Sequence, residues 1–271
     1  MIPTSTLLYT LPSTIHNAII IKRPSTSIRS PYVADILLED GTTTIAHTAA
    51  LGCCGLVEKG AHVSIIPSKN KNTKCPYQII LANTPPSQTI GIHPKIAEEI
   101  AHQALQQHRF PTLIPTTIKR EKTILQSRFD FLGQQHDGTY YILEVKNVPL
   151  AMERTDPHPL LPSFTTPSTP IKVAYFPDGY RKNKNDTVST RAVKHLYNLA
   201  EIKDKEPRIR TIILFVIQRE DIVAFQPSPH DPIYTQALLH AHQHGVEIFT
   251  LQVKWIQQQC HYITHTLPIL L

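Results

Sequence analysis

The chain has 271 residues, 41% of them hydrophobic, and its 27 Lys and Arg against 21 Asp and Glu give a formal net charge of +6. This composition predicts a folded, soluble protein of one large or two modest domains, and its basic charge favours a polyanionic partner. No membrane-length apolar run, secretory signal or Cys-x-x-Cys pair is present, so we expect a cytoplasmic protein without membrane contact, disulfide framework or structural zinc site.

The first third of the chain alternates short β-type runs with turn residues. Five strands are predicted, at residues 18–22, 32–38, 43–47, 62–66 and 77–81. Five short strands favour a small β-barrel of the OB type, which often binds single-stranded nucleic acid, although any small barrel or sandwich fits the same pattern. We therefore expect an N-terminal extension over residues 1–17 and an OB-like barrel domain over residues 18–83.

A different architecture follows a proline-rich linker at residues 83–89. Pro94 opens a helix with an apolar stripe that ends near His108. The remaining predicted elements are strands at 117–124, 128–132 and 139–148, a helix at 187–202, strands at 211–217 and 222–225, a helix at 232–244 and a strand at 246–253. The order α-β-β-β-α-β with additions predicts an α/β (α+β) domain, a mixed sheet carrying helices, over residues 92–255.

Two further segments have irregular sequences. Residues 149–172 are rich in Pro, Ser and Thr and indicate an insertion in this domain. Residues 256–271 are expected to be a C-terminal tail, either a short interaction segment or a disordered end.

The most informative stretch is the hairpin formed by the second and third strands of this domain. Side chains alternate along a strand, so Tyr141 and Val145 fill a core on one face while Glu144 and Lys146 stand together on the other, with Asp130 one strand away. Two acids and a lysine that converge on a sheet indicate a divalent-metal site for phosphodiester chemistry. The alternative is a solvated face with a cross-strand ion pair.

The order of elements favours the metal site. The region resembles the PD-(D/E)xK nucleases, restriction-endonuclease-like proteins whose α-β-β-β-α-β core has its first acid on the second strand and its Glu-x-Lys on the third. Asp130, Glu144 and Lys146 occupy those places. The resemblance therefore implies that these three residues are the catalytic set.

Several segments in the right order extend the resemblance over most of residues 18–253. They are Ser127–Leu132, Tyr141–Val148, Tyr175–Asp178, Thr190–Leu196, Phe215–Arg219, Asp231-Pro232 and Gly245–Glu247. On these segments the chain is similar to the sugar fermentation stimulation protein A family. The resemblance implies an OB-like first domain, a nuclease-like second domain, DNA binding of low sequence specificity and a regulatory link to sugar (maltose) metabolism.

These expectations assign a role to each candidate residue. Asp130, Glu144 and the backbone of Val145 would hold Mg²⁺ or Mn²⁺, and Lys146 would act on the attacking water and offset the phosphate charge. Glu98 or Glu99 would add an acid, unless both are surface charges of their helix. The expected nucleic-acid contacts, with DNA as the first choice of partner, are Lys69, Lys71, Lys74, Arg128, Arg191, Lys194 and His195.

Two readings of function remain. In the first, the chain is a DNA-binding protein of low sequence specificity in which the acids and lysine form a candidate phosphodiesterase site. In the second, metal-dependent nuclease activity is its main role. The same residues serve both, so the sequence leaves the question of an enzyme open.

Overall fold

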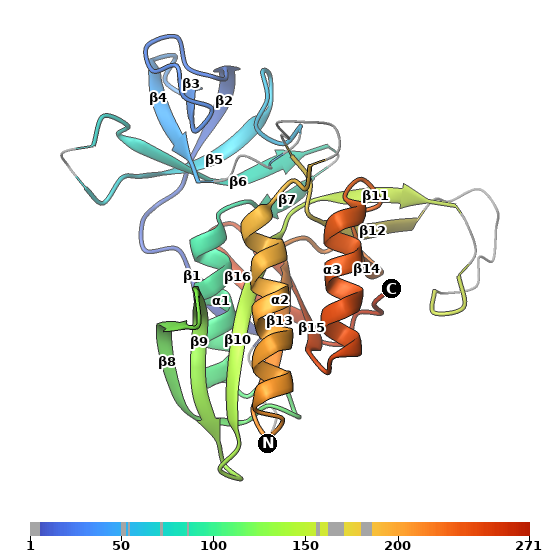
Figure 1. Cartoon of the computed structure of the whole chain (residues 1–271). Helices are drawn as coiled ribbons and strands as arrows, with labels where there is room; N and C mark the ends of the chain where they lie inside the picture. Colours follow the sequence, from blue (N-terminus) through green and yellow to red (C-terminus); the bar gives the residue numbers. More distant parts are fainter. Residues whose placement is uncertain are drawn as a thin grey trace.

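The computed structural model describes residues 6–49, 53, 55–70, 73–85, 87–155, 158–161, 171–179 and 186–271. A small β-barrel lies at one end of the molecule, above a larger sheet that carries three helices (Figure 1). This arrangement confirms the predicted fold class, an OB-like barrel followed by a mixed α/β part. None of the helices in the described residues is both long and apolar enough to cross a membrane.

The barrel is built from the five predicted strands and one more. The order β4-β3-β2-β5-β6-β7 closes on itself because β4 also pairs with β6 in parallel. Ile20, Ile36, Ile65 and Ile79 are almost fully buried inside it, as expected for inward-facing positions of a small barrel. The strands are β2 (His16–Lys22), β3 (Val33–Leu38), β4 (Thr43–Thr48), β5 (His62–Pro67), β6 (Tyr77–Thr84) and β7 (Gln88–Gly91).

The larger part is centred on a seven-stranded sheet of order β1-β16-β15-β13-β10-β9-β8. The three central strands β10, β13 and β15 run parallel, and the outer pairs are antiparallel. Parallel strands covered on both faces are nearly all apolar, which explains the fully buried run Thr211–Ile217. The strands are β1 (Leu7–Thr10), β8 (Pro115–Ile124), β9 (Ser127–Gln135), β10 (Tyr140–Val148), β13 (Arg210–Ile217), β15 (Glu247–Ile256) and β16 (Gln259–Thr264).

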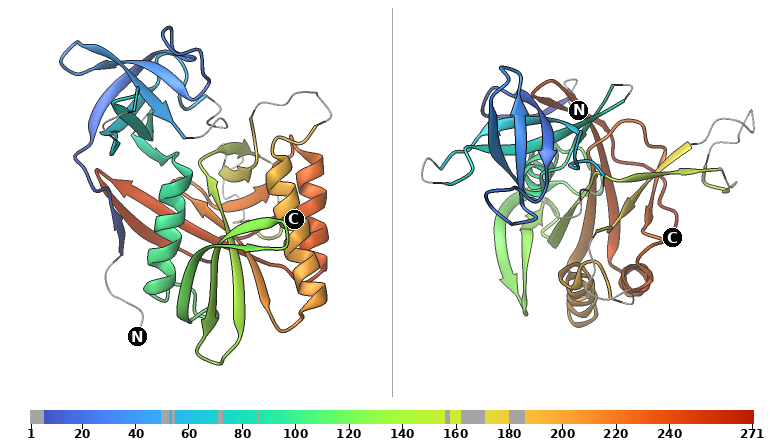
Figure 2. Two further views of the ribbon diagram at one scale, coloured as in Figure 1. Left: turned by 60° about the vertical axis from the view of Figure 1, so that its left-hand side comes forward. Right: turned by 90° about the horizontal axis from the view of Figure 1, so that it is seen from above.

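Helices cover both faces of this sheet. Helix α1 (Pro94–Gln106) packs on one face, and α2 (Thr190–Lys205) and α3 (Pro232–Gln243) pack on the other (Figure 2, left). The predicted stripe of α1 is buried throughout. The side chain of Ser189 accepts a hydrogen bond from the amide of Ala192 and so caps α2, while Asp231 caps α3 through the amide of Tyr234.

Four segments expected to be irregular form strands instead. Strand β1 lies within the expected N-terminal extension and pairs with β16, which lies within the expected tail. Strand β7 begins inside the expected linker. Strand β11 (Ala151–Arg154) lies within the expected insertion and pairs with β12 (Ile171–Phe176), which begins at the end of that insertion and joins β14 (Ala224–Pro227) in a separate three-stranded sheet. Pairing partners distant in sequence give these short segments their order, which local patterns do not report.

Gly91 lies where the barrel meets the larger sheet. A Cβ atom at this position would stand 2.0 Å from Oε1 of Gln218 and 2.6 Å from Nε1 of Trp255. The Gln218 side chain cannot easily move, since it is fully buried, donates to Oδ1 of Asn147 (2.7 Å) and accepts from Trp255 (3.0 Å).

We therefore expect Gly91→Ala to lower the free energy of unfolding by about 2–4 kcal/mol, through overpacking and a broken buried network. Urea unfolding measures this change. Gln88→Ala, in the same strand but partly exposed, is the control and should change the free energy by less than about 1 kcal/mol. Equal, small effects of both substitutions would show that the contact is not tight.

Candidate metal and nucleic-acid site

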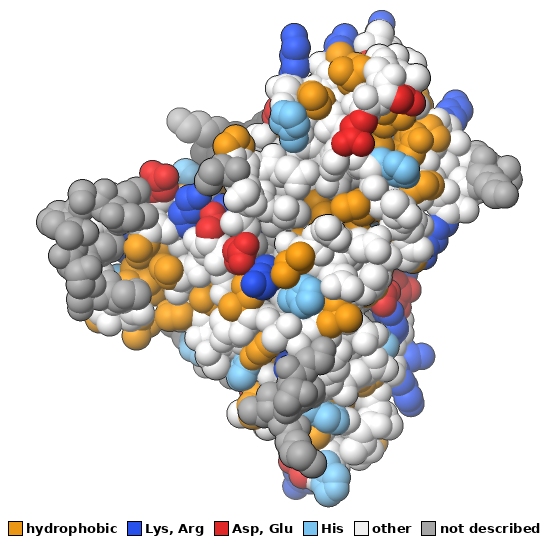
Figure 3. Space-filling model, turned by 180° about the vertical axis from the view of Figure 1, so that it is seen from behind, with side chains coloured by type: hydrophobic (Ala, Val, Ile, Leu, Met, Phe, Trp, Pro, Cys, Tyr) orange, Lys and Arg blue, Asp and Glu red, His pale blue; other side chains and the backbone are white. Residues whose placement is uncertain are grey.

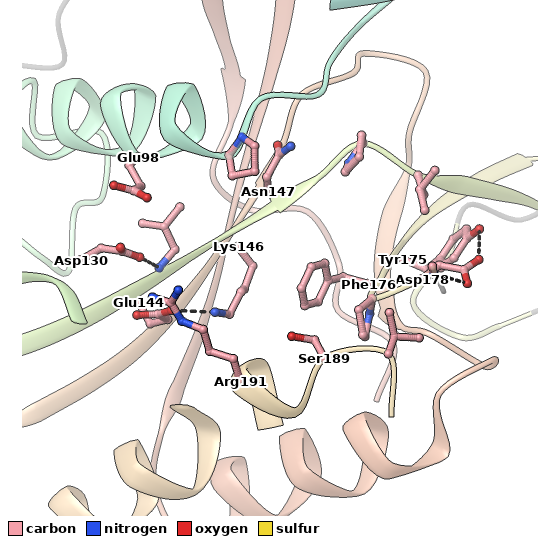
Figure 4. Close-up of a pocket in the computed structure, with 17 residues that line it drawn as sticks. Glu98, Asp130, Glu144, Lys146, Asn147, Tyr175, Phe176, Asp178, Ser189 and Arg191 are labelled. Carbon is pink, nitrogen blue, oxygen red and sulfur yellow. Dashed lines mark hydrogen bonds and ion pairs between the residues drawn. The ribbon is translucent and has the colours of Figure 1, made fainter. Parts of the chain in front are cut away.

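One pocket collects the hairpin residues together with the starts of two helices. It has a volume of about 380 Å³ and lies beside the point where the β9–β10 ladder ends, at the pair Leu143 and Phe131. Glu98 and Asp130 stand at one side of it, Lys146 and Arg191 near its centre, and Tyr175 and Asp178 at the far side (Figure 4). The pocket thus gathers groups from β9, β10, α1, α2, the end of β12 and the segment after it.

Glu144 is a buried carboxylate held by two neighbours. Its Oε1 atom accepts a hydrogen bond from Nζ of Lys146 at 2.6 Å and a second one from Nδ1 of His195. Burial acts to raise the pKa of Glu144, but the charge of Lys146 and the hydrogen bond from His195 outweigh it and hold the pKa below its usual value. Glu144 therefore remains an anion, and it is only 3% exposed.

Asp130 stands where β9 and β10 separate and is also largely buried. Its Oδ2 atom accepts a hydrogen bond from the amide of Val145 at 2.7 Å, a donor beyond the last paired residues of the ladder. Burial, followed by the negative charges of Glu144 and Glu98, raises the pKa of Asp130 from 3.8 to about 7. Like charges gathered in one buried site are unfavourable unless a cation or a proton offsets them.

The donor set fits a hard divalent cation. Oε2 of Glu144 is buried and has no hydrogen-bond partner, which leaves an acceptor available to a ligand in the pocket. No group of three or more His, Cys, Asp and Glu side chains in the described ranges is arranged as a metal cage. Mg²⁺ is usually bound by one or two carboxylates and several waters, and Asp130 and Glu144, with a backbone carbonyl near Val145, would be such a set.

The expected nucleic-acid contacts fall into three groups: basic side chains near the pocket, three lysines in the barrel segment, and His195. Arg191 is exposed and lines the pocket, and it also borders a neighbouring hollow with Arg128 and Lys194. Lys69 and Lys74 are exposed on the barrel, while Lys71 lies outside the described residues.

His195 is only 3% exposed, and its contact with Glu144 differs from the expected surface contact with a phosphate. Its Nδ1 donates to the carboxylate while its Nε2 faces Nε of Arg191 at 3.5 Å, so the two partners set the tautomer. The geometry supports a role in orienting Glu144. The periodicity of α2 could have given this burial, because His195 lies next to Leu196 and one turn before Leu199.

We expect His195→Phe to weaken Mn²⁺ binding about 10- to 100-fold, as loss of a hydrogen bond behind a metal ligand commonly does. Isothermal titration calorimetry measures the affinity, and thermal unfolding verifies that the variant is folded. His195→Asn retains a donor near the Nδ1 position and should recover part of the loss. An unchanged affinity in His195→Phe would remove the orienting role.

The two acids suggested on α1 lie in different surroundings, and two further lining residues were not assigned a role from the sequence. The structure brings Glu98 into the pocket, with its side chain 13% exposed, whereas Glu99 pairs with Arg120 at 2.7 Å. Tyr175 and Asp178 also line it, joined by a hydrogen bond of 3.1 Å. The segment Tyr175–Asp178 was among those that carried the family resemblance. The sequence thus marked this segment but did not indicate what its residues do.

The comparisons with known proteins agree with this geometry. A family described as "Sugar fermentation stimulation protein RE domain" matches residues 95–259. A sugar fermentation stimulation protein homolog of Magnetococcus marinus is 32% identical over 220 residues, covering 80% of this chain and 82% of that protein. A homolog of Clostridium perfringens is 28% identical over 250 residues, covering 91% of this chain and 94% of the other.

A solved structure shares the whole fold. It is described as the structure of Pyrococcus furiosus SfsA in complex with Ca²⁺ and superposes with a TM-score of 0.76 at 17% identity. The match covers 98% of this chain and 99% of that one. At this level of identity the likeness establishes the fold, including the barrel and the mixed sheet.

Proposed function

Because the chain belongs to the sugar fermentation stimulation protein family, we propose that it is a DNA-binding protein of low sequence specificity whose pocket holds a divalent cation. The observation that carries this proposal is the convergence of Asp130, Glu144 and Lys146 in one pocket. The regulatory link to sugar (maltose) metabolism that the family resemblance implies remains part of the proposal, without a residue assigned to it.

The cation and the nucleic acid are proposed for the same place. Mg²⁺ or Mn²⁺ would be held by Asp130 and Glu144, and it would supply charge to a phosphate drawn into the pocket. A relative with this fold was solved in complex with Ca²⁺, a cation that also prefers oxygen ligands. Arg191 lies beside the acids and offers its guanidinium to the same phosphate.

Basic side chains around the pocket support DNA binding through contacts with the phosphate backbone. Arg128, Arg191 and Lys194 border one hollow at the start of α2. In the view from the opposite side, the Lys and Arg side chains of the described residues lie mainly along the edges of the molecule (Figure 3). Contacts between such groups and phosphates carry no sequence information, which is the physical basis of low specificity.

We expect Arg191→Ala to weaken DNA binding by a similar factor for unrelated sequences and to reduce the slope of log K against log salt by about one. Fluorescence anisotropy with labelled DNA at several salt concentrations gives both quantities. Arg208→Ala, a charge removal of the same kind in the turn after α2, is the matched control and should leave the slope unchanged.

Two results of this experiment would refute the proposal. One is the absence of DNA binding by the unaltered protein at low salt. The other is an affinity that depends strongly on base sequence and weakly on salt, since base contacts rather than phosphate contacts would then dominate.

Metal-dependent nuclease activity is the second candidate. The observation that favours it is the position of Lys146, whose side chain is 11% exposed and whose amine lies 2.6 Å from Glu144 inside the pocket. There it would orient a water for attack and offset charge on the phosphate, while Glu144 and Asp130 hold their carboxylates toward the same space. The rate effect of Lys146 distinguishes this candidate from binding alone.

A further inference from the structure

The pocket continues past the acid pair into an apolar half. Beyond Lys146 its walls are formed by Pro149, Leu150, Phe176, Pro177 and Val188. Phe176 lies close to Lys146 and Ser189, while Glu98 and Asp130 lie on the opposite side (Figure 4). A site that binds only a phosphate would have polar walls throughout. The apolar half therefore indicates that an apolar part of the ligand also binds in this pocket.

The aromatic walls of this half are fixed before any ligand binds. The ring of Phe176 packs against Tyr234 and Phe215, with ring centroids 5.3 and 6.1 Å apart. The ring of Tyr175 contacts His230 at 6.0 Å, and its hydroxyl donates to Oδ2 of Asp178. Pre-formed aromatic surfaces cost little entropy on binding and suit a flat, apolar ligand group.

We propose that the apolar half binds an unpaired nucleobase next to the phosphate held by Arg191 and the acids. The preferred ligand is then a single-stranded or locally unpaired nucleotide rather than an intact duplex. This inference rests on the proposed function, because it assumes that the pocket receives a nucleic acid. In a duplex the bases are stacked inside, and the sugar and phosphate facing the protein would leave the apolar wall uncovered.

The pocket volume is compatible with this ligand. A volume of about 380 Å³ is within the roughly 300–1,000 Å³ typical of sites for small organic groups. Bases that are removed from a stack are commonly held between aromatic or apolar side chains, and every base has a π-face that such walls can accept. The proposed contact is therefore compatible with low sequence specificity.

A second stacking surface lies on the barrel. The ring of Tyr32 is 39% exposed and stacks on His47, with ring centroids 6.1 Å apart. His47 lies on β4, where it is paired with Gln78 of β6 in the barrel. A single strand that reaches from the pocket toward the barrel would find a second platform for its bases.

Three labelled probes test the inference by anisotropy: an oligothymidylate of about twelve nucleotides, a strand of equal length with abasic sugars, and a duplex of equal length. We expect the intact strand to bind at least tenfold more tightly than the abasic strand and more tightly than the duplex, since each stacked base raises the affinity by about 5- to 150-fold. Val188→Trp, which fills the apolar half from a partly exposed position, should remove most of this advantage, so that the variant binds the intact and abasic strands about equally.

A photocrosslink gives a readout that needs no variant. With 5-iododeoxyuridine in the strand, we expect crosslinks at Tyr175 or Phe176, mapped by mass spectrometry. Equal binding of intact and abasic strands, or crosslinks confined to Tyr32, would overturn the pocket assignment while leaving DNA binding in place. Failure of all three probes to bind would overturn the proposed function itself, and the inference with it.

Discussion

Asp130→Asn is expected to make the metal-free protein more stable at neutral pH, although it removes a proposed metal ligand. The folded protein holds a proton on Asp130 up to about pH 7, whereas the unfolded chain releases it near 3.8. Between these values the folded state binds more protons, so the free energy of unfolding falls as the pH rises. The free energy of unfolding falls by an amount on the order of 4 kcal/mol over the whole pH interval between these two pKa values. The Asp130→Asn variant avoids this loss because asparagine does not titrate.

Urea unfolding in the presence of EDTA at pH 4, 5.5 and 7 measures the effect. The stability difference between Asp130→Asn and the unaltered protein should grow in favour of the variant as the pH rises. Asp137→Asn is the control, because Asp137 is exposed in the hairpin turn and hydrogen bonds from Thr139 lower its pKa. A difference that stays constant between pH 4 and 7 would contradict the raised pKa of Asp130.

Lys146→Met has the largest expected effect on activity if the site cleaves DNA. Removal of the amine should slow single-turnover cleavage by about 100-fold or more, the usual scale for a group that orients the nucleophile or stabilises charge. DNA affinity should change only a few-fold, since Lys146 is mostly buried and paired with Glu144. Cleavage of labelled DNA with Mn²⁺ and anisotropy measure the two quantities.

Lys194→Met is the matched control for this substitution. It removes the same charge from an exposed position on α2 that borders the neighbouring hollow and not the pocket. If both variants cleave at the rate of the unaltered protein, Lys146 has no catalytic role. If the unaltered protein binds DNA and does not cleave it with Mn²⁺, the binding function alone remains.

Local patterns were sufficient to predict the parts of the fold that rest on local physics. The stripe of α1 is buried as expected, and so are Tyr141 and Val145 of β10, although the other face of β10 is buried as well, at Ile142 and Glu144. The small barrel and the mixed sheet carrying helices are confirmed as well. The helical period of α1 was a sufficient signal, because it fixes which side of the helix faces the core.

Long-range pairing accounts for what the sequence did not reveal. Strand β1 has only four residues, Leu7–Thr10, and acquires its partner β16 about 250 residues later. Because four residues are too few to show a periodic pattern, this segment gave no local signal of a strand. The same holds for β11 and β12, which pair across a proline-rich stretch whose composition predicts irregular structure.

The candidate site was predictable in its acids and not in its surroundings. Hairpin register brings Glu144 and Lys146 to one side of β10, and the structure has Asp130 in the same pocket. The contact between His195 and Glu144 depends on how α2 crosses the sheet, which the sequence does not specify. The apolar half depends on the turn after β12, where Phe176 and Pro177 reach the pocket from a separate sheet.

The most direct test of the account is calorimetric titration of Mn²⁺ into the metal-free protein, beside Asp130→Asn, Glu144→Gln and the control Glu99→Gln, which lies on α1 and pairs with Arg120. We predict one site in the unaltered protein, lost or weakened at least tenfold in the two pocket variants and unchanged in the control. Absence of binding, or equal binding by all four proteins, would contradict a cation site formed by Asp130 and Glu144.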